Sequence, residues 1–177
     1  ARLTRAGTAV YAMHGNRDFL LGEIFGRRTG VKLLPDPVLV DLYGVPTLLS
    51  HGDVFCTDDL PYQELRSIVR RPAWQRRFLA LQLSSRRLLA DAARAGSKAH
   101  TERQIPVLMD VNADAVTRAM RATGARRLIH GHTHRPAVHR FEIDGTPVER
   151  VVLAPWYEMA SCVAIDEAGV REVPLPR

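Results

Sequence analysis

Three short polar runs combine side chains that transition-metal ions favour as ligands. They are His14-Gly15-Asn16-Arg17-Asp18, His51-Gly52-Asp53 and Gly131-His132-Thr133-His134. Imidazole nitrogen suits ions such as Mn, Fe, Zn and Ni, and an amide oxygen suits harder ions such as Mn. Each run follows an apolar stretch, so that a strand end would deliver each set of side chains to one place. These runs predict a metal centre built from Asn16, His51, His132 and His134.

The histidine pair His132 and His134 gives the sharpest indication. Two histidines two positions apart, directly after a strand, point the same way and can each reach a different ion, and the neighbouring Gly131 permits close backbone approach. A lone histidine is more often a core or surface residue, and Asn16 by itself is more often a turn former. The combination favours ligands, whereas His14 and His130 are interpreted as packing at strand ends or as support for the ligands.

Arg17 follows Asn16 directly and indicates the kind of substrate. A guanidinium cannot act as a general acid near neutral pH, because its pKa exceeds ~12. It can hold two phosphate oxygens at once. A site with such a clamp and no acid suits a leaving group that needs no proton, such as the phosphate released from a pyrophosphate. The alternative is a surface arginine paired with Asp18.

Predicted strands and helices place these runs at element ends. A strand over 8–13 precedes His14, a hairpin of strands 38–42 and 47–49 ends at His51, and a strand over 127–129 ends at His130. Apolar spacing predicts helices over 18–28, 60–96 and 110–123. Further strands are predicted over 137–143, 148–154, 159–165 and 170–173. The pattern predicts an α/β layered sandwich that carries a helical insertion.

Charge is concentrated in that insertion. The 177 residues carry a formal charge of +6, and residues 60–104 hold ten Lys or Arg against three acids. An anionic lipid surface or nucleic acid would fit such a segment, but no recognition motif for nucleic acid accompanies it. A solvated charged face on a helical hairpin is the simpler interpretation. No apolar run approaches the ~18–20 residues of a membrane span, and the two cysteines are expected to be reduced.

The runs resemble motifs of the calcineurin-like metallophosphoesterases, and nearly the whole chain is similar to the UDP-2,3-diacylglucosamine pyrophosphatases of Gram-negative lipid A biosynthesis. The resemblance is carried by residues 14–22, 51–59, 109–112 and 130–136. It implies an αββα sandwich with a helical cap insertion over 60–104. It also implies Mn²⁺-dependent hydrolysis at the α-phosphorus, which gives UMP and 2,3-diacylglucosamine 1-phosphate (lipid X). Members of the family are peripheral proteins of the cytoplasmic face of the inner membrane.

Site roles follow from the resemblance residue by residue. It implies that Asn16, His51 and His132 ligate one of two Mn²⁺ ions and His134 the other, with Arg17 and His132 as catalytic residues. The residues implied to bind substrate are Asn16, Arg17, Asp59, Ser97, Thr101, Gln104 and His132. Thr101 and Gln104 stand where the family has Asn and Lys, and Gln104 loses a positive charge. In the insertion, Trp74, Phe78, Leu79, Leu81 and Leu83 are candidates for an acyl-chain groove beside an anionic membrane surface.

Part of the family's metal set is missing from residues 1–177. The family supplies Asp-x-His on a first strand and Gly-Asp after a second, and neither motif precedes Asn16. The metallophosphoesterase domain over 1–177 is therefore expected to be N-terminally incomplete, and this chain alone to be inactive or weak. The alternatives are a metallophosphoesterase acting on a soluble nucleotide pyrophosphate, and a non-catalytic module that binds anionic lipid. The sequence does not give the oligomeric state.

Overall fold

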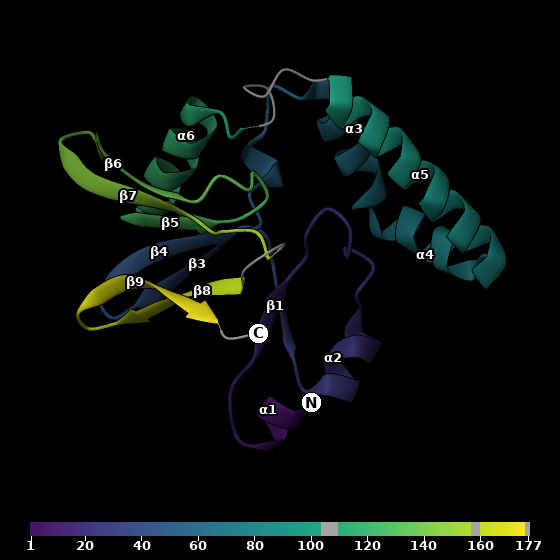
Figure 1. The fold of residues 1–177 in the computed structure, drawn as a ribbon, viewed down its shortest axis with the longest axis horizontal. Helices are drawn as coiled ribbons and strands as arrows, with labels where there is room; N and C mark the ends of the chain where they lie inside the picture. Colours follow the sequence, from purple (N-terminus) through teal and green to yellow (C-terminus); the bar gives the residue numbers. More distant parts are fainter. Residues whose placement is uncertain (104–109, 157–159, 176–177) are drawn as a thin grey trace. The chain divides into compact units, whose positions relative to one another are not determined.

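The chain folds into two units. The computed structural model describes residues 1–103, 110–156 and 160–175, and it describes side chains except in 97–103 and at 160. The first unit joins Ala1–Phe55 to Val111–Arg177, and the second is Cys56–Asp110. All four predicted metal ligands lie in the first unit, whereas the basic helices make up the second (Figure 1).

A five-stranded mixed sheet is the centre of the first unit. Its strands are β3 (Val38–Leu42), β4 (Val45–Ser50), β5 (Arg127–His130), β7 (Thr146–Val152) and β6 (Ala137–Ile143), in that order across the sheet. β4, β5 and β7 run parallel, while β3 and β6 are antiparallel to their neighbours. In this register Ser50 lies beside His130. The residues that follow β4 and β5 therefore leave the sheet at the same edge, where sites form in parallel sheets.

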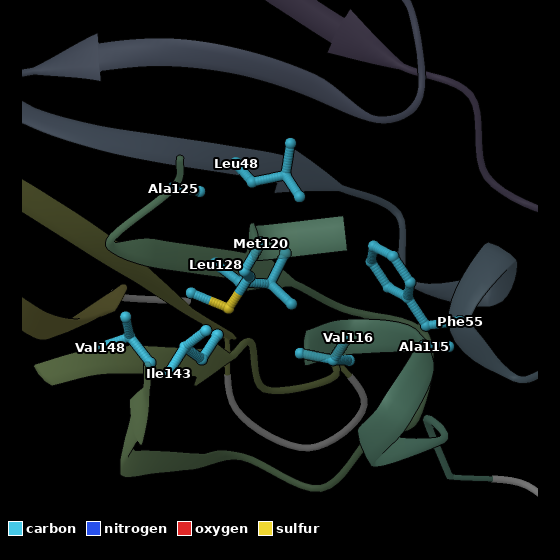
Figure 2. Close-up of a cluster of buried hydrophobic side chains, with 9 residues drawn as sticks. All are labelled: Leu48, Phe55, Ala115, Val116, Met120, Ala125, Leu128, Ile143 and Val148. Carbon is cyan, nitrogen blue, oxygen red and sulfur yellow. The ribbon is translucent and has the colours of Figure 1, made fainter. Parts of the chain in front are cut away.

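One helix covers a face of this sheet and closes the hydrophobic core. The side chain of Asn112 caps α6 (Ala113–Thr123) by accepting from the Ala115 N–H at 3.0 Å, and Gly124 ends the helix at a φ of 69°. Figure 2 shows its apolar side chains directed at those of the sheet. The cluster consists of Leu48, Phe55, Ala115, Val116, Met120, Ala125, Leu128, Ile143 and Val148. Burying these side chains fixes the strands whose ends carry the predicted ligands.

Shorter elements complete the first unit. α1 (Arg2–Arg5) precedes β1 (Tyr11–Met13), which pairs in parallel with β2 (Lys32–Leu34), and α2 (Glu23–Thr29) connects these two strands. A short 3₁₀ turn, η1, spans Asp53–Phe55. β8 (Ala160–Asp166) and β9 (Gly169–Leu175) form an antiparallel hairpin.

Helices α3 (Leu60–Val69), α4 (Pro72–Ala80) and α5 (Leu83–Arg103) form the second unit. Asp59 caps α3, and Pro61 and Pro72 occupy first-turn positions, where proline loses no helical hydrogen bond. On α4 the rings of Trp74 and Phe78 stack with centroids 5.0 Å apart. The described part of the unit exposes several large apolar side chains, which are Leu60, Leu65, Ile68, Leu79, Leu81, Leu83, Leu88 and Leu89.

The predicted α/β class is confirmed, and most predicted elements are present within a few residues. The helix predicted over 18–28 is wrong in its first turn, because the α2 helix begins only at Glu23. There Asp18 accepts from the Gly15 N–H at 2.5 Å, and His14 contacts the Leu21 carbonyl at 2.6 Å, so local polar contacts hold 18–21 in a turn. The predicted strand over 8–13 shortens to Tyr11–Met13. In the described part of the chain, no helix combines the length and apolar character that a bilayer crossing requires.

The core predicts where the first unit is sensitive to substitution. Leu128 is 0% exposed between the sheet and α6, so Leu128→Ala should lower the free energy of unfolding by about 2–5 kcal/mol. Leu39→Ala, at a position 44% exposed on the edge strand β3, should cost less than about 1 kcal/mol. Urea denaturation of both variants checks this, and equal losses would contradict the assignment of the core.

Candidate metal centre

The loop that carries His51 is held by a carboxylate distant in sequence. Asp36 Oδ1 accepts from the Ser50 hydroxyl at 2.7 Å and from the His51 N–H at 3.1 Å. The Ser50 hydroxyl also accepts from the Gly52 N–H at 3.0 Å. These bonds fix the backbone on both sides of His51 as it leaves β4. Sequence reasoning missed Asp36, because it stands in no motif and only the fold brings it to Ser50.

Three loops that carry predicted ligands meet at this edge. The Gly131 N–H donates to the His51 carbonyl at 3.0 Å, and the rings of His51 and His132 lie with centroids 5.0 Å apart at an interplanar angle of 66°. A Cβ on Gly15 would lie 3.1 Å from Cε1 of His51, so the loop that leads into Asn16 packs directly against that imidazole. The structure therefore brings together His51, His132 and the loop of Asn16.

The second histidine loop has an unusual backbone. His132 has a φ of 67° and His134 a φ of 55°, both in the left-handed region that non-glycine residues rarely adopt. The Thr133 N–H donates to the Gly131 carbonyl at 2.8 Å, which tightens the turn between them. Such conformations persist only where surrounding structure over-determines them, and they cluster at functional sites. His132 is partly buried, and His134 is exposed.

The donor set fits part of a metal centre. A histidine nitrogen binds an ion such as Zn²⁺ at about 2.0–2.1 Å, and transition ions of similar size bind comparably, so two imidazoles with centroids 5.0 Å apart can share one ion. The amide oxygen of Asn16 would add a harder ligand. No cluster of three or more His, Cys, Asp or Glu side chains with metal-ligand spacing occurs among the described residues. Two imidazoles therefore lie close enough to share one ion, and the loop that carries Asn16 packs against one of them.

Electrostatics keep the His132 imidazole in the form that ligates. Burial and, to a smaller extent, the neighbouring His51 lower the pKa of His132 to about 4, although the charge of Asp53 opposes the shift. His132 is therefore neutral at physiological pH, as a metal ligand must be. Asp53 is 0% exposed next to this loop. The sequence placed Asp53 inside a motif, but sequence reasoning assigned it no role.

Arg17 lies exposed beside Asn16, as a residue that meets a ligand from solvent would. In the described residues no ion pair joins it to Asp18, whose carboxylate accepts from the Gly15 N–H instead. The alternative interpretation of Arg17 as the salt-bridge partner of Asp18 is therefore wrong.

The remaining predicted substrate residues belong to the second unit. Asp59 Oδ1 accepts from the Tyr62 N–H at 3.2 Å, which makes Asp59 the cap of α3. Ser97 and Thr101 lie on α5 with side chains outside the described part, and Gln104 lies outside the described residues. Their predicted roles stay predictions.

Comparison with known proteins gives close relatives. No family model matches the chain. It is 49% identical to a UDP-2,3-diacylglucosamine hydrolase of Nitrosococcus oceani over 168 residues, which cover 95% of this chain and 67% of that protein. It is 47% identical to a protein of the same name from Pseudomonas aeruginosa, with 96% and 71% covered. For the Stenotrophomonas maltophilia protein of that name, identity is 44%, with 94% and 70% covered.

Among solved structures, a novel archaeal phosphodiesterase is similar at 12% identity and a TM-score of 0.48, covering 98% of this chain and 73% of that one. That likeness is too weak to support any assignment. The sequence identities to the curated relatives, over nearly the whole chain and at least two thirds of their length, are decisive: the chain belongs to the UDP-2,3-diacylglucosamine hydrolase family.

Proposed function

We propose that this protein hydrolyses the pyrophosphate bond of UDP-2,3-diacylglucosamine at the α-phosphorus and releases UMP and 2,3-diacylglucosamine 1-phosphate. The name of its relatives supports this substrate. The observation that carries the reaction type is the meeting of His51 and His132, with ring centroids 5.0 Å apart, at the edge of the sheet where the Asn16 loop also packs. A water-exposed arginine beside this set supplies the phosphate-binding group.

In this proposal the site is a calcineurin-like metal centre. Asn16, His51 and His132 would hold one Mn²⁺ ion, and His134 would contribute to a second. Bound metal would polarise a phosphoryl oxygen and lower the pKa of a water molecule. The chain itself contributes the imidazoles of His51 and His132, on loops joined by the hydrogen bond between the Gly131 N–H and the His51 carbonyl. Asn16 and His132 also contact the substrate phosphates.

Arg17 binds the pyrophosphate and stabilises charge that develops on it. Its guanidinium stays protonated through the reaction and donates to two phosphate oxygens at once. The leaving group is a phosphate monoester, which departs as an anion without needing a proton. A permanent cation therefore suits this substrate better than an acid would.

The second unit would bind the lipid part of the substrate and the membrane. Trp74 and Phe78 stack on α4, and the leucines at 79, 81 and 83 are exposed among exposed arginines. Apolar side chains surrounded by basic ones suit acyl chains beneath anionic head groups. Asp59, Ser97, Thr101 and Gln104 would contact the substrate head group. The protein would act at the cytoplasmic face of the inner membrane as a peripheral protein.

The first test is Mn²⁺-dependent release of UMP from UDP-2,3-diacylglucosamine. Asn16→Ala and His132→Ala should each lower turnover at least about a hundredfold and weaken Mn²⁺ binding, because each removes a ligand. His139→Ala, at an exposed position on β6, should leave both unchanged. The unfolding midpoint without metal should be similar in all variants.

Because the relatives are longer than this chain, the assay is run on this chain and on a form with their full length, and weak turnover is expected from this chain alone. Equal hydrolysis of a soluble UDP-sugar would instead favour a nucleotide pyrophosphatase. Salt-sensitive lipid binding without turnover by either form would favour a binding module.

Substitutions of Arg17 test whether this residue binds the substrate phosphates or is only a surface charge. Arg17→Ala should lower kcat/KM by about a hundredfold without weakening Mn²⁺ binding, because Arg17 binds substrate and not the ion. Arg17→Lys keeps the charge but loses the planar pair of donors, so it should restore only part of the rate. Steady-state kinetics and metal titration decide this, and a rate unchanged by Arg17→Ala would remove the residue from the site.

Membrane contact by the second unit can be measured with vesicles. Arg76 and Arg77 are exposed on α4, and replacing both with Gln should weaken binding to phosphatidylglycerol-containing vesicles about tenfold or more. The matched control replaces the exposed Arg126 and Arg140 of the first unit, which should change binding little. Equal losses from the two pairs would show that net charge alone drives the attraction.

A further inference from the structure

His130 is a buried polar residue for which the proposed reaction has no use. It ends β5 and is 0% exposed, directly before the loop that carries His132 and His134. Its own backbone is held in the sheet, because the Leu153 N–H donates to its carbonyl at 2.8 Å. A fully buried imidazole in this position needs partners for both of its nitrogens.

Both ring nitrogens have such partners, and the two partners fix the tautomer. Nδ1 lies 2.9 Å from the Gly131 carbonyl oxygen, and Nε2 lies 3.2 Å from a guanidinium nitrogen of Arg150. A carbonyl oxygen only accepts, and a guanidinium only donates. The ring proton must therefore be on Nδ1, with the Nε2 lone pair directed at Arg150. Because both nitrogens are engaged, His130 is not a metal ligand here.

The same ring also packs against the loop of His51. A Cβ on Gly52 would lie 2.9 Å from Nδ1 of His130 and 3.0 Å from the Gly131 carbonyl oxygen, and Gly52 has a φ of 112°. Only glycine fits there without displacing the ring or the carbonyl. His130 is thus in contact with both loops whose histidines face each other, at Gly52 on one side and at Gly131 on the other.

We propose that Arg150 and His130 form a positioning pair for the metal centre. Arg150, on β7, holds His130 in the Nδ1–H tautomer, and the Nδ1–H in turn orients the Gly131 carbonyl and supports the strained backbone of His132. This arrangement sets the separation of the His51 and His132 rings. The inference rests on the proposed metal centre for its purpose, but the tautomer and the ring separation can be tested without metal.

The experiment compares the wild type with Arg150→Met, Arg150→Lys and the control Arg140→Met, an exposed arginine on β6. Nitrogen-15 NMR of the imidazoles identifies the protonated nitrogen of His130, and the nuclear Overhauser effect between ring protons reports the His51–His132 separation. Titration with Mn²⁺ alone measures affinity, and thermal unfolding verifies that each variant is folded.

We expect the proton on Nδ1 of His130 in the wild type and in Arg140→Met. Arg150→Met removes one of the two partners and leaves only the Gly131 carbonyl to favour this tautomer, so it should weaken the preference, weaken the ring contact and lower Mn²⁺ affinity about 10–100-fold, the usual cost of removing support behind a ligand. Arg150→Lys should recover part of each effect, because lysine still donates to Nε2. A purely structural role would change the unfolding temperature but not the tautomer.

A proton on Nε2 of His130 in the wild type would overturn the proposal. So would a folded Arg150→Met that keeps both the ring contact and the wild-type affinity. If the wild type binds no Mn²⁺, the proposed metal centre fails, and the ring contact alone then tests the positioning pair. Loss of the His51–His132 ring contact in Arg150→Met would support the pair, and retention of that contact would overturn it.

Discussion

The parallel register of β4 and β5 is the constraint on which the site depends. Ser50 lies beside His130, and one residue further on the Gly131 N–H donates to the His51 carbonyl at 3.0 Å. This bond extends the ladder one step beyond the sheet, so that both histidine loops start from a common rigid edge. A slip of one residue would turn every side chain of a strand to the opposite face and separate the two imidazoles.

Burial on both faces of the central strands enforces that register. Leu128 packs under α6, and on the opposite face the adjacent Arg127 forms an ion pair of 2.6 Å with Glu149 of β7 while only 9% of its side chain is exposed. Removing either partner would leave a buried charge uncompensated. The pair therefore penalises a misaligned β5–β7 ladder more strongly than apolar contacts alone would. Apolar packing and the buried charge thus select the same alignment.

Sequence patterns were sufficient to predict those features whose residues lie close together in the chain. Strand-end motifs could be predicted because the ligand types stand next to short apolar runs, and α6 because Asn112 and Gly124 mark its ends. The start of α2 could not be predicted, because Asp18 and His14 bond to nearby backbone and compete with the helix. The supporting roles of Asp36 and Arg150 could not be predicted either. Their contacts with Ser50 and His130 span 14 and 20 residues and exist only once the strands are paired.

The strained backbone of the loop that carries His132 and His134 is held by hydrogen bonds within the site. His132 and His134 both hold left-handed backbones, which cost about 1–3 kcal/mol each and persist only where surrounding contacts over-determine them. The contacts on either side of His132 come from its neighbours: the Gly131 N–H donates to the His51 carbonyl, the His130 ring bonds the Gly131 carbonyl, and the Thr133 N–H closes the turn. None of these contacts requires an ion, so the protein itself can hold the His51 and His132 rings close together. Affinity for the ion then need not offset the ordering of that loop, which is how preorganisation strengthens binding.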